Sequence, residues 1–333
     1  KSYKIGQPTE DGVYIGALSR KSQLDFLEKQ VQDAVKKGAT LLTGGKRIEG
    51  NGYFFEPTVL TNVNHKMDVM QAESFGPIIG IMKVKDDILL ILTNTASLLY
   101  NKNVFTLHDV IFLYYPESYS IFHRMYYKFS VGFHLKSSKL ILTVSEYSKK
   151  SILKNYPKCD EKKIKVIYNA VPKVFNNGLS FYNNSEIKNY CVLSSFDNNK
   201  NLQVVIDAFK INKRPDIRLL ILGSHVQKHP NLLAKALEDP RIVSYGHVTD
   251  EKLAEIYQTT YAFIIPSKLE GFGIPPLEAQ SFGCPVLASE SSCLPEILGN
   301  SALYFDPDRP ENLSVLIDFI SDNIDQRNLL VKK

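Results

Sequence analysis

The chain has 333 residues, which is enough for two or three domains of ordinary size. Hydrophobic residues make up 44% of it and charged residues 23%, the composition of a soluble globular protein with a sizeable core. The formal net charge is only +5, and Lys and Arg form no long run, so the sequence does not favour a nucleic-acid partner.

The cysteines and the hydropathy pattern narrow the class further. The four cysteines, Cys159, Cys191, Cys284 and Cys293, form no CxxC pair and have no zinc-site spacing, so we expect reduced thiols and no bound metal. The N-terminal segment is polar, unlike a signal peptide, and no apolar run approaches the roughly 18 residues of a membrane span. The pattern predicts a cytoplasmic protein.

Residues 1–86 are predicted to form one unit. Apolar residues at helical spacing predict a helix over residues 23–37, which Gly38 ends. A short apolar run at 39–42 follows, and then the segment GYFFEPTVL, which reads as a strand broken by Pro57. The segment ESFGPIIGIMKV reads as a turn that leads into a strand.

From residue 87 onward strands and helices alternate, and this alternation predicts parallel α/β sheets. In residues 87–172 we expect strands at 88–92, 104–107, 140–144 and 164–168, an aromatic helix at 118–135 and a helix at 146–155. In the last part we expect strands at 190–193, 219–222, 262–265 and 285–288, and helices around 202–209 and at 250–258 and 276–282. A doubly wound sheet is the natural interpretation of the last part.

The segment Glu270-Gly-Phe-Gly-Ile-Pro-Pro-Leu-Glu278-Ala279 carries the most chemistry. It follows a buried strand and opens a helix, and its two carboxylates can accept hydrogen bonds from hydroxyl groups. Gly271 and Gly273 allow the backbone to approach a ligand closely, and the N–H groups at the start of a helix favour a phosphate. A nucleotide sugar needs both kinds of contact.

Residues 87–333 resemble the family-4 glycosyltransferases, which are retaining enzymes of the GT-B fold. The resemblance is carried by EGFGIPPLEAQSFGCPVLAS together with TLHD, TVSEYSKKSI, VIYNAV, NNKNL and ILGS, in the order of that family. It implies two Rossmann-like domains, here residues 87–172, as an incomplete acceptor-side domain, and 173–333, as a nucleotide-sugar domain.

The resemblance also implies residue roles. Glu270 would contact hydroxyls of the transferred sugar and Glu278 the ribose hydroxyls, while Lys200 would neutralise the donor diphosphate. His108, in TLHD, would lie beside the sugar across the cleft. The backbone of Gly271, Phe272 and Gly273 would surround the sugar and phosphates. Such enzymes need no metal and no cofactor beyond the UDP- or GDP-linked donor.

The sequence departs from the family pattern at several places. Ser194 stands where a glycine is usual, the Lys200 loop lacks the arginine that many members have, and Asn169-Ala170 replaces Asn-Gly at the hinge. The resemblance further implies that the opening strands of the acceptor-side domain and a C-terminal crossing helix are missing. Acceptor binding and domain closure therefore become open questions.

Residues 1–86 resemble a different family, the aldehyde dehydrogenases, through IGALSRKSQLDFLEKQV, GATLLTGGKR, GYFFEPTVL and ESFGPIIGIMKV. Glu73 matches the glutamate that holds the nicotinamide ribose in that family and Phe75 the phenylalanine near it, and we expect both to be vestigial. The glycine-rich cofactor turn, the nucleophilic cysteine and the general base of that family are absent, so its chemistry cannot run. The chain reads as a junction of two unrelated fragments near residues 85–88.

The main hypothesis is hexosyl transfer with retention from a nucleotide sugar to a saccharide or lipid-linked acceptor. The alternatives are an NAD(P)-dependent aldehyde dehydrogenase and an inactive remnant that only binds nucleotide sugar. The hypothesis leaves open a peripheral contact with the inner face of a membrane. The aromatic run from Tyr119 to Phe133 is of a kind that more often belongs to a core than to a membrane-binding surface.

The candidate residues also have plain structural interpretations. Glu270 and Glu278 would then be helix-terminal carboxylates, Lys200 a solvated lysine and His108 a core histidine at the end of a strand. For the neighbouring residues the structural interpretation is preferred. Asp109 is expected to cap the next turn, Ser145 and Glu146 to cap a helix, and Cys284 and Cys293 to be small buried residues. His225 fits either a donor contact or an exposed loop.

Overall fold

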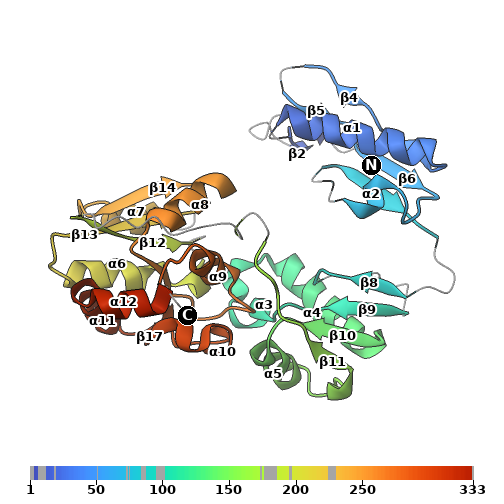
Figure 1. The fold of residues 1–333 in the computed structure, drawn as a ribbon. Coiled ribbons are helices and arrows are strands. Elements are labelled where there is room, and N and C mark those ends of the chain that lie inside the picture. Colours follow the sequence, from blue (N-terminus) through green and yellow to red (C-terminus); the bar gives the residue numbers. More distant parts are fainter. Residues whose placement is uncertain are drawn as a thin grey trace. The chain divides into compact units, whose positions relative to one another are not determined.

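The chain divides into two compact units, Lys1–Asp87 and Ile88–Lys333. In this computed structural model the described residues are 4–6, 13–18, 20–50, 52–72, 74, 76–83, 88–94, 102–172, 175, 186–194, 197–223 and 230–331. Each unit has its own hydrophobic core, and each is described by itself below (Figure 1).

The first unit packs one long helix against short strands. Its elements are β1 (Lys4–Ile5), β2 (Val13–Ile15), α1 (Lys21–Lys36), β3 (Thr40–Thr43), β4 (Arg47–Ile48), β5 (Phe54–Phe55), β6 (Thr58–Thr61), α2 (Asp68–Gln71) and β7 (Ile78–Ile81). The α1 stripe of Leu24, Leu27, Val31 and Ala34 is buried, which confirms the predicted amphipathic helix. Strand β6 pairs antiparallel with β3 and parallel with β7. Pro57 lies between β5 and β6, where the broken strand was predicted.

The second unit begins with a four-stranded parallel sheet in the order β11-β10-β9-β8. Its elements are β8 (Leu89–Ile91), β9 (Asn103–Thr106), α3 (Ile111–Tyr114), η1 (Pro116–Ser118), α4 (Ile121–Ser137), β10 (Leu140–Thr143), α5 (Glu146–Asn155), η2 (Glu161–Lys163) and β11 (Ile164–Val166). Phe105 and Ile141 from the sheet pack with Val131 of α4 and Ile152 of α5. We call residues 88–172 the first lobe.

A six-stranded parallel sheet follows, in the order β14-β13-β12-β15-β16-β17. Its elements are β12 (Lys188–Leu193), η4 (Asn198–Lys200), α6 (Leu202–Ile211), β13 (Ile217–Leu222), α7 (Pro230–Ala236), β14 (Ile242–Gly246), α8 (Asp250–Thr259), β15 (Ala262–Ile265), α9 (Ile274–Ser281), β16 (Val286–Ser289), α10 (Leu294–Leu298), η5 (Gly299–Ser301), β17 (Ala302–Phe305), α11 (Pro310–Asp322) and α12 (Ile324–Val331). We call residues 186–331 the second lobe.

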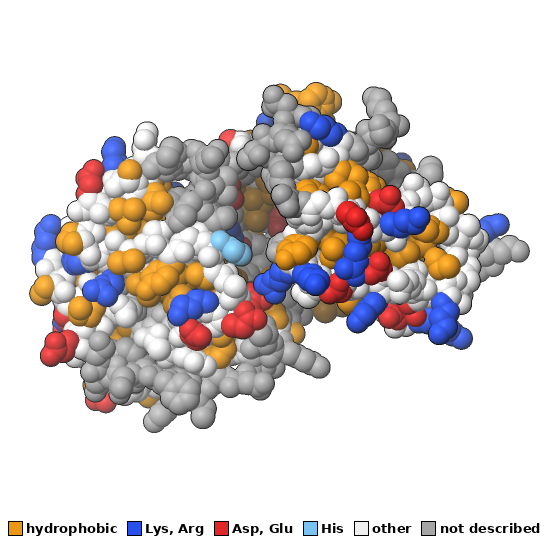
Figure 2. All heavy atoms as spheres, turned by 90° about the horizontal axis from the view of Figure 1, so that it is seen from above, with side chains coloured by type: hydrophobic (Ala, Val, Ile, Leu, Met, Phe, Trp, Pro, Cys, Tyr) orange, Lys and Arg blue, Asp and Glu red, His pale blue; other side chains and the backbone are white. Residues whose placement is uncertain are grey.

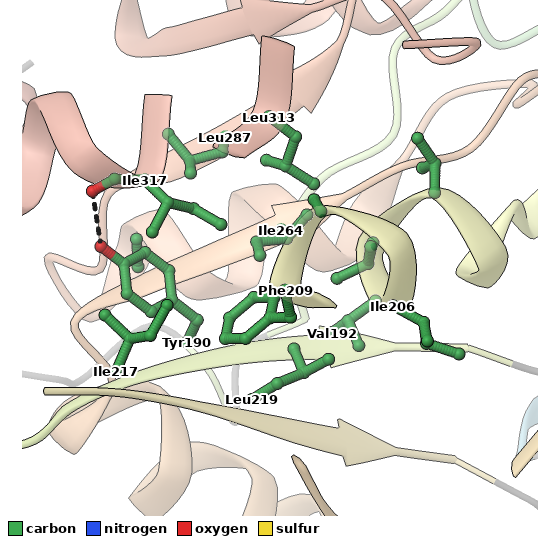
Figure 3. Close-up of a cluster of buried hydrophobic side chains, with 14 of the residues drawn as sticks. Tyr190, Val192, Ile206, Phe209, Ile217, Leu219, Ile264, Leu287, Leu313 and Ile317 are labelled. Atoms are coloured by element: carbon green, nitrogen blue, oxygen red, sulfur yellow. Dashed lines mark hydrogen bonds between the residues drawn. The ribbon is translucent and has the colours of Figure 1, made fainter. Parts of the chain in front are cut away.

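The second lobe has helices on both faces of its sheet, as a doubly wound fold requires. Alternate residues of β12 point to opposite faces, because the side-chain period of a strand is two. Tyr190 and Val192 pack with α6 and α11, whereas Cys191 packs with α8 and α9. Figure 3 shows the first of these cores, where the Tyr190 hydroxyl donates a hydrogen bond to the Ile317 carbonyl at 3.2 Å. The predicted doubly wound α/β architecture is confirmed.

The aromatic helix differs from the expectation of a core segment. In α4, Phe122 is 83% exposed, Met125 68% and Phe129 66%, and only the side that carries Val131 and Leu135 is buried. The expectation was wrong because α4 is apolar around most of its circumference. Periodicity then does not select a buried face, and the narrow sheet covers only one side.

Charges are mixed on the face of the molecule that Figure 2 shows. Among the described residues there, Lys and Arg side chains are interspersed with Asp and Glu and with hydrophobic side chains. This face carries no extended field of one sign. That agrees with the small net charge.

Candidate functional site

The sheet of the second lobe reverses its direction of growth between β12 and β15. Numbered from β12 along the chain, the strands lie in the order 3-2-1-4-5-6. The helix that follows β12, α6, and the helix that follows β15, α9, therefore pack on opposite faces of the sheet. Ligands bind parallel α/β sheets at the carboxyl ends of the strands beside such a switch point. The loop after β12 carries Lys200, and the loop after β15 carries Glu270.

The two loops bring Lys200 and Glu270 together. Lys200 Nζ lies 2.7 Å from Glu270 Oε1, with side-chain exposures of 32% and 12%. The loops are also tied by backbone, because the Lys268 N–H donates to the Asn199 carbonyl at 2.8 Å. Asn201, with φ of 50°, directs its amide to the carbonyls of Pro266 and Pro307. The candidate sugar-binding and phosphate-binding groups thus form a pre-assembled ion pair.

The glycines of the donor loop, residues 270–273, are needed for close approach. A Cβ on Gly271 would lie 2.9 Å from the His108 carbonyl oxygen and 3.1 Å from Asp109 Cβ. Gly273 has φ of 85° and precedes the first residue of α9, a conformation that favours glycine. Gly271 thus allows the donor loop to pack directly on the backbone of the first lobe.

The first turn of α9 has fewer backbone N–H groups that could donate a hydrogen bond to a phosphate than an ordinary helix has. Pro275 and Pro276 occupy its second and third positions and have no N–H. At this helix end, only Gly273 and Ile274 therefore keep an N–H group that has no acceptor within the helix. The expected anion site at this helix start is therefore reduced.

Glu278 lies in the second turn of α9 and is only 8% exposed. Burial raises the pKa of its carboxyl, and Asp250 raises it further, whereas the hydrogen bond from Tyr257 lowers it. The Tyr257 hydroxyl lies 3.5 Å from Glu278 Oε2. A buried carboxylate with one long hydrogen bond, from Tyr257, keeps acceptor capacity for hydroxyl groups.

His108 and Asp109 follow β9 and face the donor loop with their backbone. His108 Nε2 lies 3.0 Å from the Leu92 carbonyl, and the His108 N–H donates to Asn94 Oδ1 at 2.9 Å. Asp109 accepts the Ile111 N–H at 2.9 Å, which confirms its capping role. Burial raises the pKa of Asp109, and the nearby Glu270 carboxylate raises it further.

Ser145, Ser148 and Glu296 join the lobes at this point, and the sequence singled out only Ser145, as a helix cap. Ser145 caps α5 as expected, but its hydroxyl and that of Ser148 also donate to the Gly271 carbonyl, at 2.7 and 3.2 Å. Glu296 accepts the first two N–H groups of α5 and the Tyr168 hydroxyl. The cavity that remains beside Asp109 and Glu270 measures only about 10 Å³, so the lobes are closed here.

Some of the predicted residues lie outside the part of the chain that the structure describes. Glu73, Phe75 and His225 lie outside the described residues, as do Ser195 and Phe196 next to the Lys200 loop. Among the described residues, no group of three or more His, Cys, Asp or Glu could hold a metal ion. No helix in the described ranges is long and apolar enough to cross a membrane.

The chain matches two families in different parts. Residues 182–333 match the model of the glycosyl transferases group 1, and residues 1–112 that of the aldehyde dehydrogenase family. The dehydrogenase match runs past Asp87, the end of the first compact unit.

Individual relatives show the same division. The chain is 32% identical over 219 residues to the O-antigen chain mannosyltransferase RfbU of Salmonella typhimurium, which covers 65% of this chain and 59% of that protein. It is 42% identical over 98 residues to mitochondrial succinate-semialdehyde dehydrogenase of Mus musculus, 29% of this chain and 19% of that protein. The chain thus spans less than two thirds of either relative.

The fold has solved counterparts. The Anabaena protein HepE, solved with UDP and glucose, aligns with a TM-score of 0.61 and 15% identity, covering 78% of this chain and 80% of that one. At that identity the likeness concerns the fold, which is the GT-B fold. The chain therefore joins an aldehyde dehydrogenase segment, in its N-terminal part, to a domain of the glycosyl transferases group 1 family.

Proposed function

We propose that residues 88–333 belong to a glycosyltransferase that moves a hexose from a UDP- or GDP-sugar to a saccharide or lipid-linked acceptor, with retention. The observation that carries the proposal is the Lys200–Glu270 pair at the switch point of the second sheet. Glu270 lies on the loop that leads into α9, the helix that carries Glu278. The matched relative is named as an O-antigen chain mannosyltransferase, and HepE was solved with UDP and glucose.

The geometry suggests how these groups share the work. Transfer forms a bond between the sugar C1 and the acceptor oxygen and breaks the bond between C1 and the diphosphate oxygen. Negative charge develops on the leaving diphosphate, which can take up the proton that the acceptor hydroxyl loses. Lys200 has three N–H donors and uses one on Glu270, so it can keep that bond and still donate to phosphate oxygens. Its charge would stabilise the leaving group in place of a metal ion. Glu270 would accept sugar hydroxyls and Glu278 ribose hydroxyls.

The dehydrogenase alternative has no support from the cysteines. Burial raises the pKa of Cys191 and of Cys293 to about 12, and it raises the pKa of Cys159 and Cys284 as well. A nucleophilic cysteine needs a lowered pKa, because the thiolate is the reactive form.

Lys200→Met tests the proposed transfer. We expect a loss of about 100- to 1000-fold in kcat for release of nucleoside diphosphate from UDP-glucose or GDP-mannose, because charge on the leaving group is no longer stabilised. The matched control is Lys210→Met, an exposed lysine of α6, which should keep full activity. Equal rates for both variants would contradict the proposal, and NAD-dependent oxidation of an aldehyde would favour the alternative.

Helix α4 carries the surface that we connect with the lipid-linked acceptor. Its exposed stripe of Ile121, Phe122, Met125 and Phe129 lies on a helix that contains three Lys or Arg and no Asp or Glu. An apolar face flanked by cations is what an anionic lipid surface binds. We propose that this stripe brings the first lobe to a membrane that carries the lipid-linked acceptor.

The double change of Phe122 and Phe129 to Ser should weaken binding to phosphatidylglycerol vesicles at least tenfold. Full burial of a Phe side chain is worth about 1.5–3 kcal/mol, so two partial burials exceed a tenfold effect. Co-sedimentation measures the change, with Phe319→Ser, a 41% exposed residue of α11, as the control. Unaltered sedimentation of the double variant would show that α4 is not the lipid contact.

A further inference from the structure

The first turn of α5 is completed by a residue from the other lobe. The N–H groups of Glu146 and Tyr147 donate to Glu296 Oε1 and Oε2, at 2.7 and 2.9 Å. The next N–H, of Ser148, donates to Ser145 Oγ at 3.0 Å. The N–H groups of the first three residues of α5 are therefore all bonded to side chains, and two of them to a carboxylate 149 to 150 residues away in the chain.

This arrangement is favourable for physical reasons. A carboxylate at a helix N-terminus interacts with the positive end of the helix dipole, and its bonds to N–H groups are charge-assisted. The Tyr168 hydroxyl donates to the same Oε1 at 2.9 Å, so the carboxylate accepts three hydrogen bonds. Glu296 is thereby held in one orientation between the lobes.

The same turn of α5 also holds the donor loop. Ser145 and Ser148 donate to the carbonyl of Gly271, the residue after Glu270. From the other side, the Glu270 N–H donates to Ser292 Oγ at 3.1 Å, just before α10. Phe272 packs on the ring of Tyr168, with 5.8 Å between ring centroids. The donor loop, α5 and α10 thus form a closed set of contacts in which Glu296 joins α10 to α5.

We propose that Glu296 is a positioning residue for the transfer reaction. By capping α5 from the second lobe, it places the Ser145 and Ser148 hydroxyls on Gly271 and so sets the donor loop, at Gly271, against the His108 backbone. Glu296 touches neither donor nor acceptor in this role, and acts only through α5. The inference rests on the proposed function, because it concerns the geometry of that site.

Glu296→Ala should raise the hydrogen-exchange rate of the Glu146 and Tyr147 amides at least tenfold. It should also lower kcat for the nucleotide sugar about tenfold or more, while the Kd for UDP or GDP stays within about twofold, because Lys200 and Glu278 are untouched. Glu296→Gln keeps the shape and one acceptor oxygen, so it should give smaller effects on both. The control is Glu311→Ala, an exposed carboxylate in the first turn of α11.

These measurements distinguish a failure of the positioning role of Glu296 from a failure of the proposed transfer function. Unchanged exchange at Glu146 and Tyr147 would show that Glu296 does not cap α5 in solution. Faster exchange with an unchanged kcat would make the cap purely structural, and either result overturns the inference. If the unaltered chain neither binds UDP or GDP nor turns over a nucleotide sugar, the proposed function is wrong. The positioning role then falls with it, whatever the exchange data show.

Discussion

Glu278→Gln is expected to weaken binding of UDP or GDP, whichever the chain recognises, by about 100-fold. The proposed role of this carboxylate is to accept both ribose hydroxyls. A hydrogen bond to a charged acceptor contributes about 1.5–3 kcal/mol, and the amide retains only one acceptor oxygen. A loss of about 3 kcal/mol corresponds to roughly 100-fold in Kd. Calorimetric titration measures it, with Glu311→Gln as the control, and unchanged affinity in Glu278→Gln would rule out the proposed ribose contact.

The pH dependence of nucleotide affinity tests the same contact between Glu278 and the ribose. Burial raises the pKa of Glu278, so its carboxyl protonates at a higher pH than an ordinary glutamate. Nucleotide affinity should therefore fall on acidification above the usual glutamate range, and this dependence should be reduced in Glu278→Gln.

The contribution of Glu278 to folding stability should change with pH in the opposite direction to nucleotide affinity. A carboxyl whose folded pKa is raised stabilises the fold only while it is protonated, and this contribution is lost as the pH rises through the folded pKa. The Gln variant should thus be at least as stable as the unaltered chain at neutral pH. A variant that binds poorly because it has unfolded is thereby distinguished from one that has lost a ligand contact.

Phe209→Ala and Leu27→Ala are expected to destabilise different parts of the chain. Phe209 is fully buried in the second lobe and packs edge-on against Tyr190, with 6.0 Å between the ring centroids. Both side chains are labelled in Figure 3. Leu27 is fully buried in the core of the first unit. Truncation of a buried Phe costs about 3–5 kcal/mol and of a buried Leu about 2–5 kcal/mol.

Scanning calorimetry should then show two transitions. The two cores belong to separate compact units, so each variant should lower the Tm of one transition and leave the other in place. For the unit of residues 88–333, about 4 kcal/mol corresponds to a fall of roughly 8–16 °C. Phe26→Ala, at a 37% exposed position of α1, is the control for Leu27. A single transition that both variants shift would show that the units unfold together.

Local patterns in the sequence predicted the local elements well. Helix α5 and strand β15 have the predicted bounds, because Ser145 is a strong N-cap and the 262–265 run is short, apolar and bounded by polar and Pro residues. Elements with weaker patterns, such as β14 and β17, were not predicted. The site residues Lys200, Glu270 and Glu278 came from motif resemblance, since spacing alone does not distinguish them from ordinary surface charges.

The sequence by itself determined the α/β class, the two-family composition and the residue types of the candidate site. Only the tertiary structure decided which of those residues meet. Lys200 and Glu270 are 70 residues apart, and they pair because β12 and β15 are neighbours in the sheet. Glu296 reaches α5 because the lobes close on one another, and α4 exposes its aromatic residues because the sheet covers one side only. Periodicity and capping act within a few residues, whereas sheet order and lobe closure depend on contacts between distant segments, which no local pattern records.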